Sequence, residues 1–308
     1  MIELRHLRYF RAVAEEQHFH RAAERIPMDL SALSRAVREL EDYVGVELLV
    51  RSPAGTRITP AGARMLEEVR GVFDAIEQAT RGAREVDGRE RLPLRIGIAD
   101  GLIQPMLSQC LALWRERVPE IGLELIELRT LLMAEALRRE EIDVGFTFGL
   151  CVAEGLVQEP AWSYSLLVLM RAGHALAGRP TLALSDVIDQ PLIVCDPAYK
   201  PGVHHQVDRL LRKEADGAEL TIAGNAGSLA SFMTQIGAGY GVGLVDVGHM
   251  QSMARPDLAM VPLADPEAEL VTHMLWKPPR DGQPLHASVR RFVEHVRAMR
   301  DASATAAP

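Results

Sequence analysis

The sequence contains no apolar run long enough to cross a membrane, so we expect no membrane partner. Its N-terminus is charged and periodic from Glu3 onward, unlike the basic and apolar regions of a signal peptide. Cysteine is scarce, because the 308 residues include only Cys110, Cys151 and Cys195. These three are widely spaced and fit no metal-ligand pattern, which indicates a reducing compartment. We therefore expect a cytoplasmic protein that needs no metal or other cofactor.

Excess positive charge is also missing, since the formal net charge is −8 at pH 7. A general nucleic-acid coat protein needs a basic surface, so that class is excluded. A protein that reads one DNA sequence can still be acidic if its arginines gather on a single face. No nucleophile, base and orienting group occur in a recognisable set, so we expect no enzyme activity. The glycine-rich run 237–243 imitates a dinucleotide fingerprint, but it follows a helix and precedes a strand, the reverse of the required order.

The sequence does have 48% apolar residues and enough length for two or three domains. The first domain opens with an apolar-striped helix that starts at Leu4, followed by helices at 19–26 and 29–44. Two short strands, 48–51 and 56–59, come next and turn at 52–55. Three short helices and a β-hairpin form a winged helix-turn-helix, which lays its third helix in the DNA major groove. We therefore expect a double-stranded DNA operator as a partner.

The third helix is predicted to have two different faces, with Asp29 as its N-cap. Apolar residues at helical spacing predict a buried stripe of Leu33, Val37, Leu40 and Val44. Hydroxyl and guanidinium groups on the other face suit phosphate oxygens and guanine edges. The candidate DNA contacts are Ser31, Ser34, Arg35 and Arg38, with Arg51 and Arg57 in the wing. A solvated helix face is the alternative interpretation of these arginines.

A long helix is predicted to begin at Thr59 and Pro60, an N-cap hydroxyl followed by proline at the first helical position. Apolar positions then alternate steps of three and four, as in the seam of a coiled coil. The predicted dimerisation residues are Leu66, Val69, Phe73 and Ile76. The alternative is an amphipathic helix packed on its own chain.

From about residue 93 the pattern changes to alternating strands and helices, which predicts a parallel sheet with helices on both faces. The expected strands are 94–99, 121–128, 142–148, 165–170, 191–195, 220–223, 243–245 and 271–276. The expected helices are 104–118, 130–141, 203–213, 228–237 and 287–299. The tail 301–308 is small and polar, and we expect it to be disordered.

A series of short motifs runs through residues 4–62. They are Leu7, Tyr9 and Phe10, then Arg21-Ala22-Ala23, Ala32-Leu33-Ser34-Arg35, Leu40-Glu41, Gly45-Val46-x-Leu48, Arg51-Ser52 and Ile58-Thr59-Pro60-Ala61-Gly62. These motifs resemble the DNA-binding domain of LysR-type transcriptional regulators, and the same organisation runs to about Arg300. Leu30 stands where the family usually has a base-reading glutamine, and Ala54 where a basic residue is common. Leu30 therefore joins the DNA-facing candidates without a group that can form a hydrogen bond.

The resemblance implies an α/β protein in three parts. These are a winged helix-turn-helix at 1–59, a linker and dimerisation helix at 60–88, and an effector-binding domain at 89–308. The last would be two-lobed, like a type II periplasmic binding protein, with lobe I at about 93–163 and 268–300 and lobe II at about 164–267. The implied protein is a homodimeric or homotetrameric transcription regulator that binds an effector between its lobes and acts on RNA polymerase. Two alternatives stay open: a redox-sensing regulator that uses Cys151 and Cys195, and a solute-binding protein or enzyme with a helical accessory module.

Ligands of open α/β sheets bind beyond the carboxyl ends of strands and at helix N-termini. The resemblance, nearest to the benzoate, muconate and chlorocatechol branch, aligns several loop residues here with effector-lining positions. The candidate set is Asp100, Gly101, Leu102, Thr130, Phe148, Lys200, Pro201, Val203, His204 and Ser228.

Two of these candidates bear on the charge of the ligand. Phe148 stands where an arginine would pair with a carboxylate, and Asp100 adds a negative charge, which disfavours a dianion. Lys200 and His204 offer compensation, so a carboxylate, an aromatic, a neutral and an amine-bearing ligand all remain open. The plainer interpretation makes Thr130 a helix cap and His204 a solvated helix start.

Overall fold

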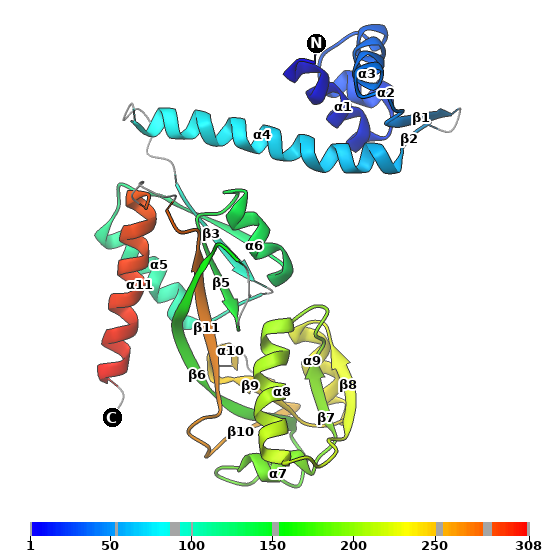
Figure 1. Ribbon diagram of the computed structural model, residues 1–308. Helices are drawn as coiled ribbons and strands as arrows, with labels where there is room; N and C mark the ends of the chain where they lie inside the picture. Colours follow the sequence, from blue (N-terminus) through cyan, green and yellow to red (C-terminus); the bar gives the residue numbers. More distant parts are fainter. Residues whose placement is uncertain are drawn as a thin grey trace. The chain divides into compact units, whose positions relative to one another are not determined.

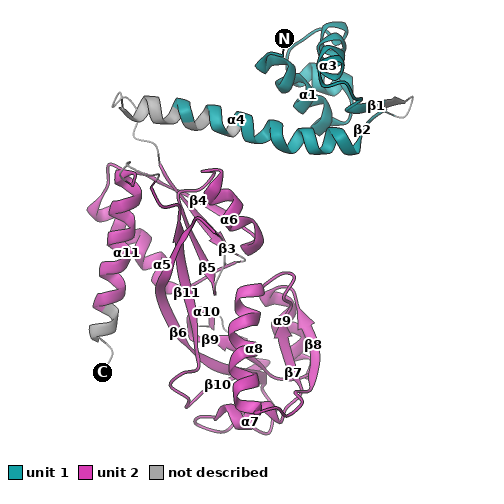
Figure 2. Ribbon diagram, in the orientation of Figure 1, with its two compact units in different colours: residues 1–89 teal, residues 90–308 magenta. Residues whose placement is uncertain are grey.

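The computed structural model describes residues 2–52, 55–86, 93–99, 101–149, 154–250, 255–279 and 285–306 (Figure 1). The chain forms two compact units, residues 1–89 and 90–308, and each is treated by itself (Figure 2). None of the helices in the described part is long and apolar enough to cross a membrane.

Unit 1 is a winged helix followed by a long helix. Its elements are α1 (Leu4–Glu16), α2 (Phe19–Arg25), α3 (Leu30–Val44), β1 (Leu49–Ser52), β2 (Gly55–Ile58) and α4 (Pro60–Val86). Each predicted element is present, with ends that differ by one residue or so. The three short helices pack around Phe10, Val13 and Leu33, which have no exposed surface. The predicted stripe on α3 is correct except at Val44, which is 39% exposed because the helix has run past the core by its last residue.

The two predicted caps in unit 1 have different outcomes. Thr59 caps α4, because its hydroxyl oxygen accepts from the backbone N–H of Gly62 at 2.9 Å. Asp29 occupies the N-cap position of α3, but its side chain makes no capping bond to the backbone. Its carboxylate instead accepts from the hydroxyl of Ser31 at 2.5 Å. The prediction that the Asp29 carboxylate caps the backbone of α3 was therefore wrong, because this carboxylate accepts from the Ser31 hydroxyl and not from a backbone N–H.

The first half of α4 packs on its own chain, which corrects the predicted seam. Val69 is 1% exposed and belongs to the core of unit 1, so it cannot lie in a dimer interface. Leu66 and Phe73 pack against the same core, and the guanidinium of Arg11 lies 4.6 Å from the centre of the Phe73 ring. Of the four predicted residues only Ile76 is exposed, at 37%. The three-four spacing is therefore explained at Val69 by packing within unit 1, whereas Leu66 and Phe73 are only partly buried and their place in a dimer seam stays a prediction.

Unit 2 is built on a seven-stranded mixed sheet and a separate two-stranded sheet. The strands are β3 (Leu94–Ala99), β4 (Leu123–Leu128), β5 (Val144–Phe148), β6 (Val157–Arg171), β7 (Leu192–Cys195), β8 (Ile222–Ala226), β9 (Gly243–Asp246), β10 (Leu258–Pro262) and β11 (Glu269–Trp276). The helices are α5 (Pro105–Arg117), α6 (Thr130–Arg138), α7 (Leu184–Ile188), α8 (Pro201–Ala215), α9 (Leu229–Gly237), α10 (Val247–Met250) and α11 (Ala287–Ala306). In Figure 1, α5 and α11 lie together on one face of the large sheet and α6 covers the other.

The prediction of a parallel sheet was only partly correct. β3 is parallel to β4 and β5, and β7 is parallel to β8. β11, however, is antiparallel to both β5 and β6. β6 is a 15-residue strand that pairs with β11 in its first half and with β9 and β10 in its second. Such a strand needs no crossover helix on each side, so the alternation of strands and helices did not reveal it.

The C-terminal tail is also different from the expectation. α11 continues to Ala306 instead of ending near residue 299, so most of the tail predicted to be disordered is helical. Three short elements, α7, α10 and β10, were not predicted at all. Each has only four or five residues, too few to display a periodic pattern.

Candidate functional site

The outer face of α3 carries a group of exposed polar side chains. Ser31, Arg35 and Arg38 are exposed and Ser34 is half-buried. Neither of the two guanidinium groups forms an ion pair with the described part of the chain, whereas Arg25 on α2 contacts both Glu15 and Glu16. Arg35 and Arg38 are therefore available to an anionic partner.

The remaining DNA-facing candidates lie in the β-hairpin and at the start of α3. Arg57 is exposed on β2 and stands opposite Val50 in the hairpin. Arg51 lies on β1 opposite Thr56, and its side chain is outside the described part. Leu30 is the first residue of α3 and packs partly against the core of unit 1, so its side chain helps to anchor the helix. An anchored helix with a cationic outer face, next to a β-hairpin, is the geometry of a winged helix on DNA.

Unit 2 contains a pocket between β5, β6, β9 and β11 on one side and α8 and α9 on the other. It encloses about 450 Å³, part of it open to solvent. The lining residues are Phe148, Leu166, Cys195, Lys200, Val203, Val207, Leu229, Phe232, Leu244, Val245, Asp246, His249 and Leu270. Phe148, Lys200 and Val203 were predicted. Most of the others are apolar, so the pocket suits a ligand with an apolar body.

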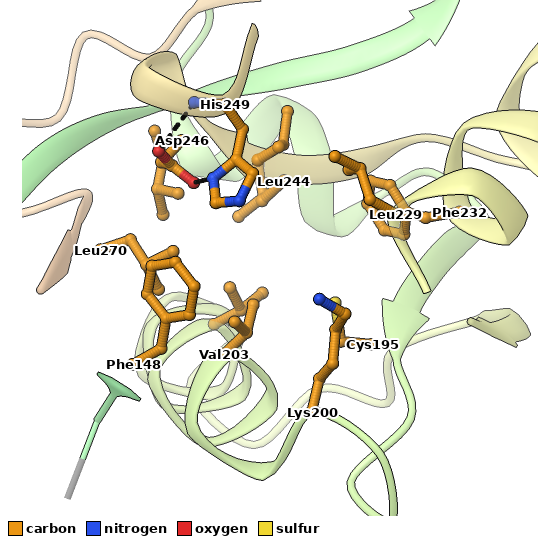
Figure 3. Close-up of a pocket in the computed structure, with 13 residues that line it drawn as sticks. Phe148, Cys195, Lys200, Val203, Leu229, Phe232, Leu244, Asp246, His249 and Leu270 are labelled. Carbon is orange, nitrogen blue, oxygen red and sulfur yellow. Dashed lines mark hydrogen bonds and ion pairs between the residues drawn. The ribbon is translucent and has the colours of Figure 1, made fainter. Parts of the chain in front are cut away.

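Two polar groups on one wall are Asp246, at the end of β9, and His249, in α10. His249 Nδ1 lies 2.6 Å from a carboxylate oxygen of Asp246, and both side chains are almost fully buried. Lys200 and Val203 face this pair from the opposite wall (Figure 3). Neither Asp246 nor His249 was predicted. A carboxylate directly after an apolar strand, with an imidazole three residues later, was the signal that could have identified them.

The start of α8 closely approaches the end of β5. A Cβ atom on Gly202 would lie 1.4 Å from the carbonyl oxygen of Phe148, so only glycine fits there. Gly149 likewise has a φ of +75° and sits against the backbone of Gly202. The approach brings Lys200 and Val203 to the same pocket as Phe148.

Several predicted effector residues lie elsewhere. Gly101 contacts the pocket indirectly, because its carbonyl oxygen is 3.4 Å from His249 Nε2. Leu102 is buried in the core, Pro201 opens α8, and Ser228 caps α9 by accepting from the backbone N–H of Ser231. Asp100 lies outside the described residues.

Thr130 and His204 also differ from the simple expectation. Arg129, and not Thr130, is the N-cap of α6, and the buried Thr130 hydroxyl lies 3.3 Å from that of Thr147. His204 is not a solvated helix start, because its Nδ1 lies 2.7 Å from the carbonyl oxygen of Cys195. It lines a second, smaller cavity of about 260 Å³ beside the main pocket.

The described cysteines are both unpaired, and Cys110 is buried while Cys195 is half-buried. Burial raises the pKa of the Cys195 thiol to about 11 and that of Cys110 to about 12. The thiolate is the reactive form, so neither thiol is activated at neutral pH. Cys151, the other half of the suggested redox pair, lies outside the described residues. Within the described ranges, no three or more histidine, cysteine, aspartate or glutamate side chains are grouped so that they could bind a metal ion.

A DNA-binding winged helix joined to a pocket-bearing α/β unit defines the class of transcription regulators that respond to a ligand. Residues 4–63 match the family model "Bacterial regulatory helix-turn-helix protein, lysR family", and residues 87–301 match "LysR substrate binding domain". The chain therefore belongs to the LysR family and is a LysR-type DNA-binding transcriptional regulator. The expected family, fold class and function are confirmed.

Individual relatives agree with this assignment. The chain is 30% identical over 275 residues to the regulator BenM of Acinetobacter baylyi, covering 87% of each chain. It is 29% identical over 276 residues to the Hca operon transcriptional activator HcaR of Escherichia coli, covering 90% of this chain and 92% of HcaR. The crystal structure of the LysR family regulator CbnR has the same fold, with a TM-score of 0.78 at 22% identity over 97% of this chain and 99% of CbnR.

Proposed function

We propose that this regulator binds its operator through the outer face of α3 and responds to a small molecule held in the pocket of unit 2. The DNA-binding domain comprises residues 1–59, the linker helix 60–88 and the effector domain 89–308. The observation that carries the proposal is the pair of exposed guanidinium groups, Arg35 and Arg38, on the helix that a winged helix presents to DNA. The protein acts in the cytoplasm on RNA polymerase at its promoters and catalyses no reaction itself.

The effector is an aromatic compound with one carboxylate. The rings of Phe148 and Phe232 and the surrounding aliphatic side chains favour an apolar, flat body. Lys200 projects its ammonium group into the cavity and supplies one charge-assisted hydrogen bond to an acid group (Figure 3). The carboxylate of Asp246 on the opposite wall disfavours a second acid group at that end.

The protein works as a dimer whose protomers meet along the exposed side of α4. Val72 and Ile76 lie four residues apart there, 39% and 37% exposed. They form one apolar stripe on the side not used for packing on α1. Two winged helices held together contact two half-sites about one helical turn apart, which supplies the specificity that one domain lacks. A tetramer is a pair of such dimers.

The DNA part of the proposal is tested with a duplex from the region upstream of the protein's own gene. Fluorescence anisotropy of wild-type protein is compared with the double variant Arg35→Ala/Arg38→Ala. We expect tight, sequence-selective binding by the wild type and only weak, non-selective binding by the variant. Equal binding of both proteins to this duplex would refute the assigned surface.

The effector part is tested by calorimetry with benzoate, the smallest aromatic carboxylate. Lys200→Met should weaken binding by about 10-fold to 100-fold, because a hydrogen bond to a charged group contributes about 1.5–3 kcal/mol. Lys213→Met is the matched control, since Lys213 lies on α8, the helix that follows Lys200, with its ammonium bonded to Glu267 on the surface. Equal losses in both variants, or no binding of benzoate to the wild type, would contradict the proposed ligand class.

A further inference from the structure

A buried polar network connects the pocket wall to the turn between β3 and α5. Asp246 accepts from the amide nitrogen of Gln104 at 3.2 Å and from the backbone N–H of His249 at 3.1 Å. Gln104 is the residue just before α5 and is 2% exposed. Its side-chain oxygen accepts from Trp162 Nε1 at 2.6 Å and from the Thr272 hydroxyl at 2.8 Å. Trp162 and Thr272 face each other on β6 and β11, beside the irregularity in that strand pair.

His249 makes the second connection to the same turn. A carboxylate can only accept, so the proton of the 2.6 Å bond to Asp246 resides on His249 Nδ1. In the neutral imidazole, Nε2 is then an acceptor, and the backbone N–H of Ile103 points to it at 3.4 Å. This separation is at the long end of hydrogen-bond lengths, so the contact is weak and sensitive to small movements of the ring.

We propose that His249 is the residue through which an occupant of the pocket acts on the turn Gly101–Gln104. The inference rests on the proposed function, because it concerns regulation at the effector pocket. His249 lines the cavity with one side of its ring, 5.6 Å from the ring of Phe148. Its Nε2 accepts from the backbone N–H of Ile103 in the turn.

The direction of the effect follows from the position of the ring. His249 lies between the cavity and the turn, and Val203 faces it across the cavity (Figure 3). A ligand body between Val203 and His249 presses the imidazole toward Ile103 and shortens the weak contact. Asp246 keeps the ring from rotating away, since it holds Nδ1 at 2.6 Å. Occupancy therefore tightens the turn that begins α5, and Gln104 carries the change to β6 and β11.

The test measures hydrogen exchange of the Ile103 amide in the full-length protein by mass spectrometry at residue resolution. His249→Asn keeps a donor nitrogen near the Nδ1 position but removes the group that reaches Ile103. We expect this variant to exchange the Ile103 amide about fivefold faster, the loss of one weak hydrogen bond. His295→Asn is the matched control: His295 is similarly buried but bonds to the carbonyl oxygen of Cys110, and Ile103 exchange should not change.

Val203→Phe fills the cavity from α8 without any ligand. We expect about fivefold slower exchange of the Ile103 amide in Val203→Phe, and a change below about twofold when the same substitution is made in His249→Asn. An equal effect of Val203→Phe in both backgrounds would overturn the proposal, because a purely structural His249 gives additive changes. If Val203→Phe does not fold, as judged by circular dichroism, the smaller Val203→Leu replaces it in the same double-mutant cycle with His249→Asn. An equal effect of Val203→Leu with and without His249→Asn would again overturn the proposal. Benzoate calorimetry is separate from this cycle, so failure of the proposed ligand class and failure of the coupling are distinguishable.

Discussion

At the scale of single residues, the proposed DNA contact of α3 depends on Arg35 and Arg38, which form no ion pair within the described residues. Removing one base-edge contact costs about 1–3 kcal/mol, so Arg35→Ala should weaken operator binding by about 10-fold to 100-fold. Anisotropy titration at physiological salt measures this loss. Arg25→Ala is the control, because Arg25 is exposed but paired with Glu15 and Glu16. A similar loss in Arg25→Ala would mean that the effect comes from general charge and not from the α3 face.

The cysteines give a prediction about reactivity and pH. Burial raises the pKa of Cys195 to about 11, so its thiolate is scarce at pH 7.5 and increases only as the pH rises toward that value. We expect iodoacetamide to label Cys195 in the native protein far more slowly than a free cysteine, with a rate that climbs with pH. Peptide mass spectrometry identifies the labelled residue. Rapid labelling of Cys195 at neutral pH would revive the redox-sensing alternative.

Single residues also show what the sequence can reveal of a site. Phe148, Lys200 and Val203 could be predicted because they follow strands or begin a helix, where open sheets bind ligands. Asp246 and His249 could not, because the sequence does not tell whether a buried polar residue faces a core or a cavity. That distinction depends on α10 folding back onto the turn before α5, a contact between residues about 145 positions apart in the chain, as in the pair Ile103 and His249.

At the scale of secondary-structure elements, α4 packs one side on its own unit and leaves Val72 and Ile76 exposed on another, which is the side we propose for dimerisation. The double variant Val72→Glu/Ile76→Glu places charge on the exposed apolar side, where pairing with a second copy would bury it at high cost. We expect monomers by analytical ultracentrifugation and an unchanged circular dichroism spectrum. Glu67→Ala/Glu68→Ala is the control on the same helix, since both side chains are solvated. An unchanged oligomer in the Val72/Ile76 variant would place the dimer contact elsewhere.

The contact between α8 and β5 gives a second prediction at this scale. Gly202→Ala would put a methyl group into the carbonyl of Phe148, so the helix start and the strand end must separate. We expect the melting temperature to fall by several degrees, since overpacking costs about 1–3 kcal/mol. Differential scanning fluorimetry measures the shift. Gly173→Ala is the control, because its added methyl group meets nothing and its backbone is not left-handed. Equal melting temperatures for the two variants would show that α8 can move away freely.

Elements differed in how well the sequence predicted them. The starts of the helices in unit 1 were predicted to within about a residue, because a cap or a change of periodicity marks them locally. The long helix was also found, but its partner was not, since a three-four alternation looks the same whether Val69 meets a second chain or its own α1. β6 and β11 were predicted as short parallel strands because their pairing is non-local: Val157 pairs with Trp276, more than a hundred residues away.

At the scale of the whole molecule, a protein with a negative net charge must bind negatively charged DNA through a few positively charged side chains on one face. The net charge is −8, so DNA affinity depends on a small number of phosphate contacts and falls with salt in proportion to them. Arg57→Ala should lower the slope of log K against log salt by about two per dimer, one contact from each protomer. It should weaken binding to operator and unrelated DNA alike. A change in sequence preference without a change of slope would mean that Arg57 reads a base.

The length of β6 has a mechanical consequence for the effector unit. One continuous strand of 15 residues pairs with β11 near its start and with β9 and β10 near its end, so no loose joint separates the two regions it links. Any rotation of one region against the other must twist this strand and the ladders attached to it, and the twist is resisted elastically. We therefore expect rotations of one region against the other to be small and to reverse when the ligand dissociates. A regulator built in this way resets by itself as its effector dissociates.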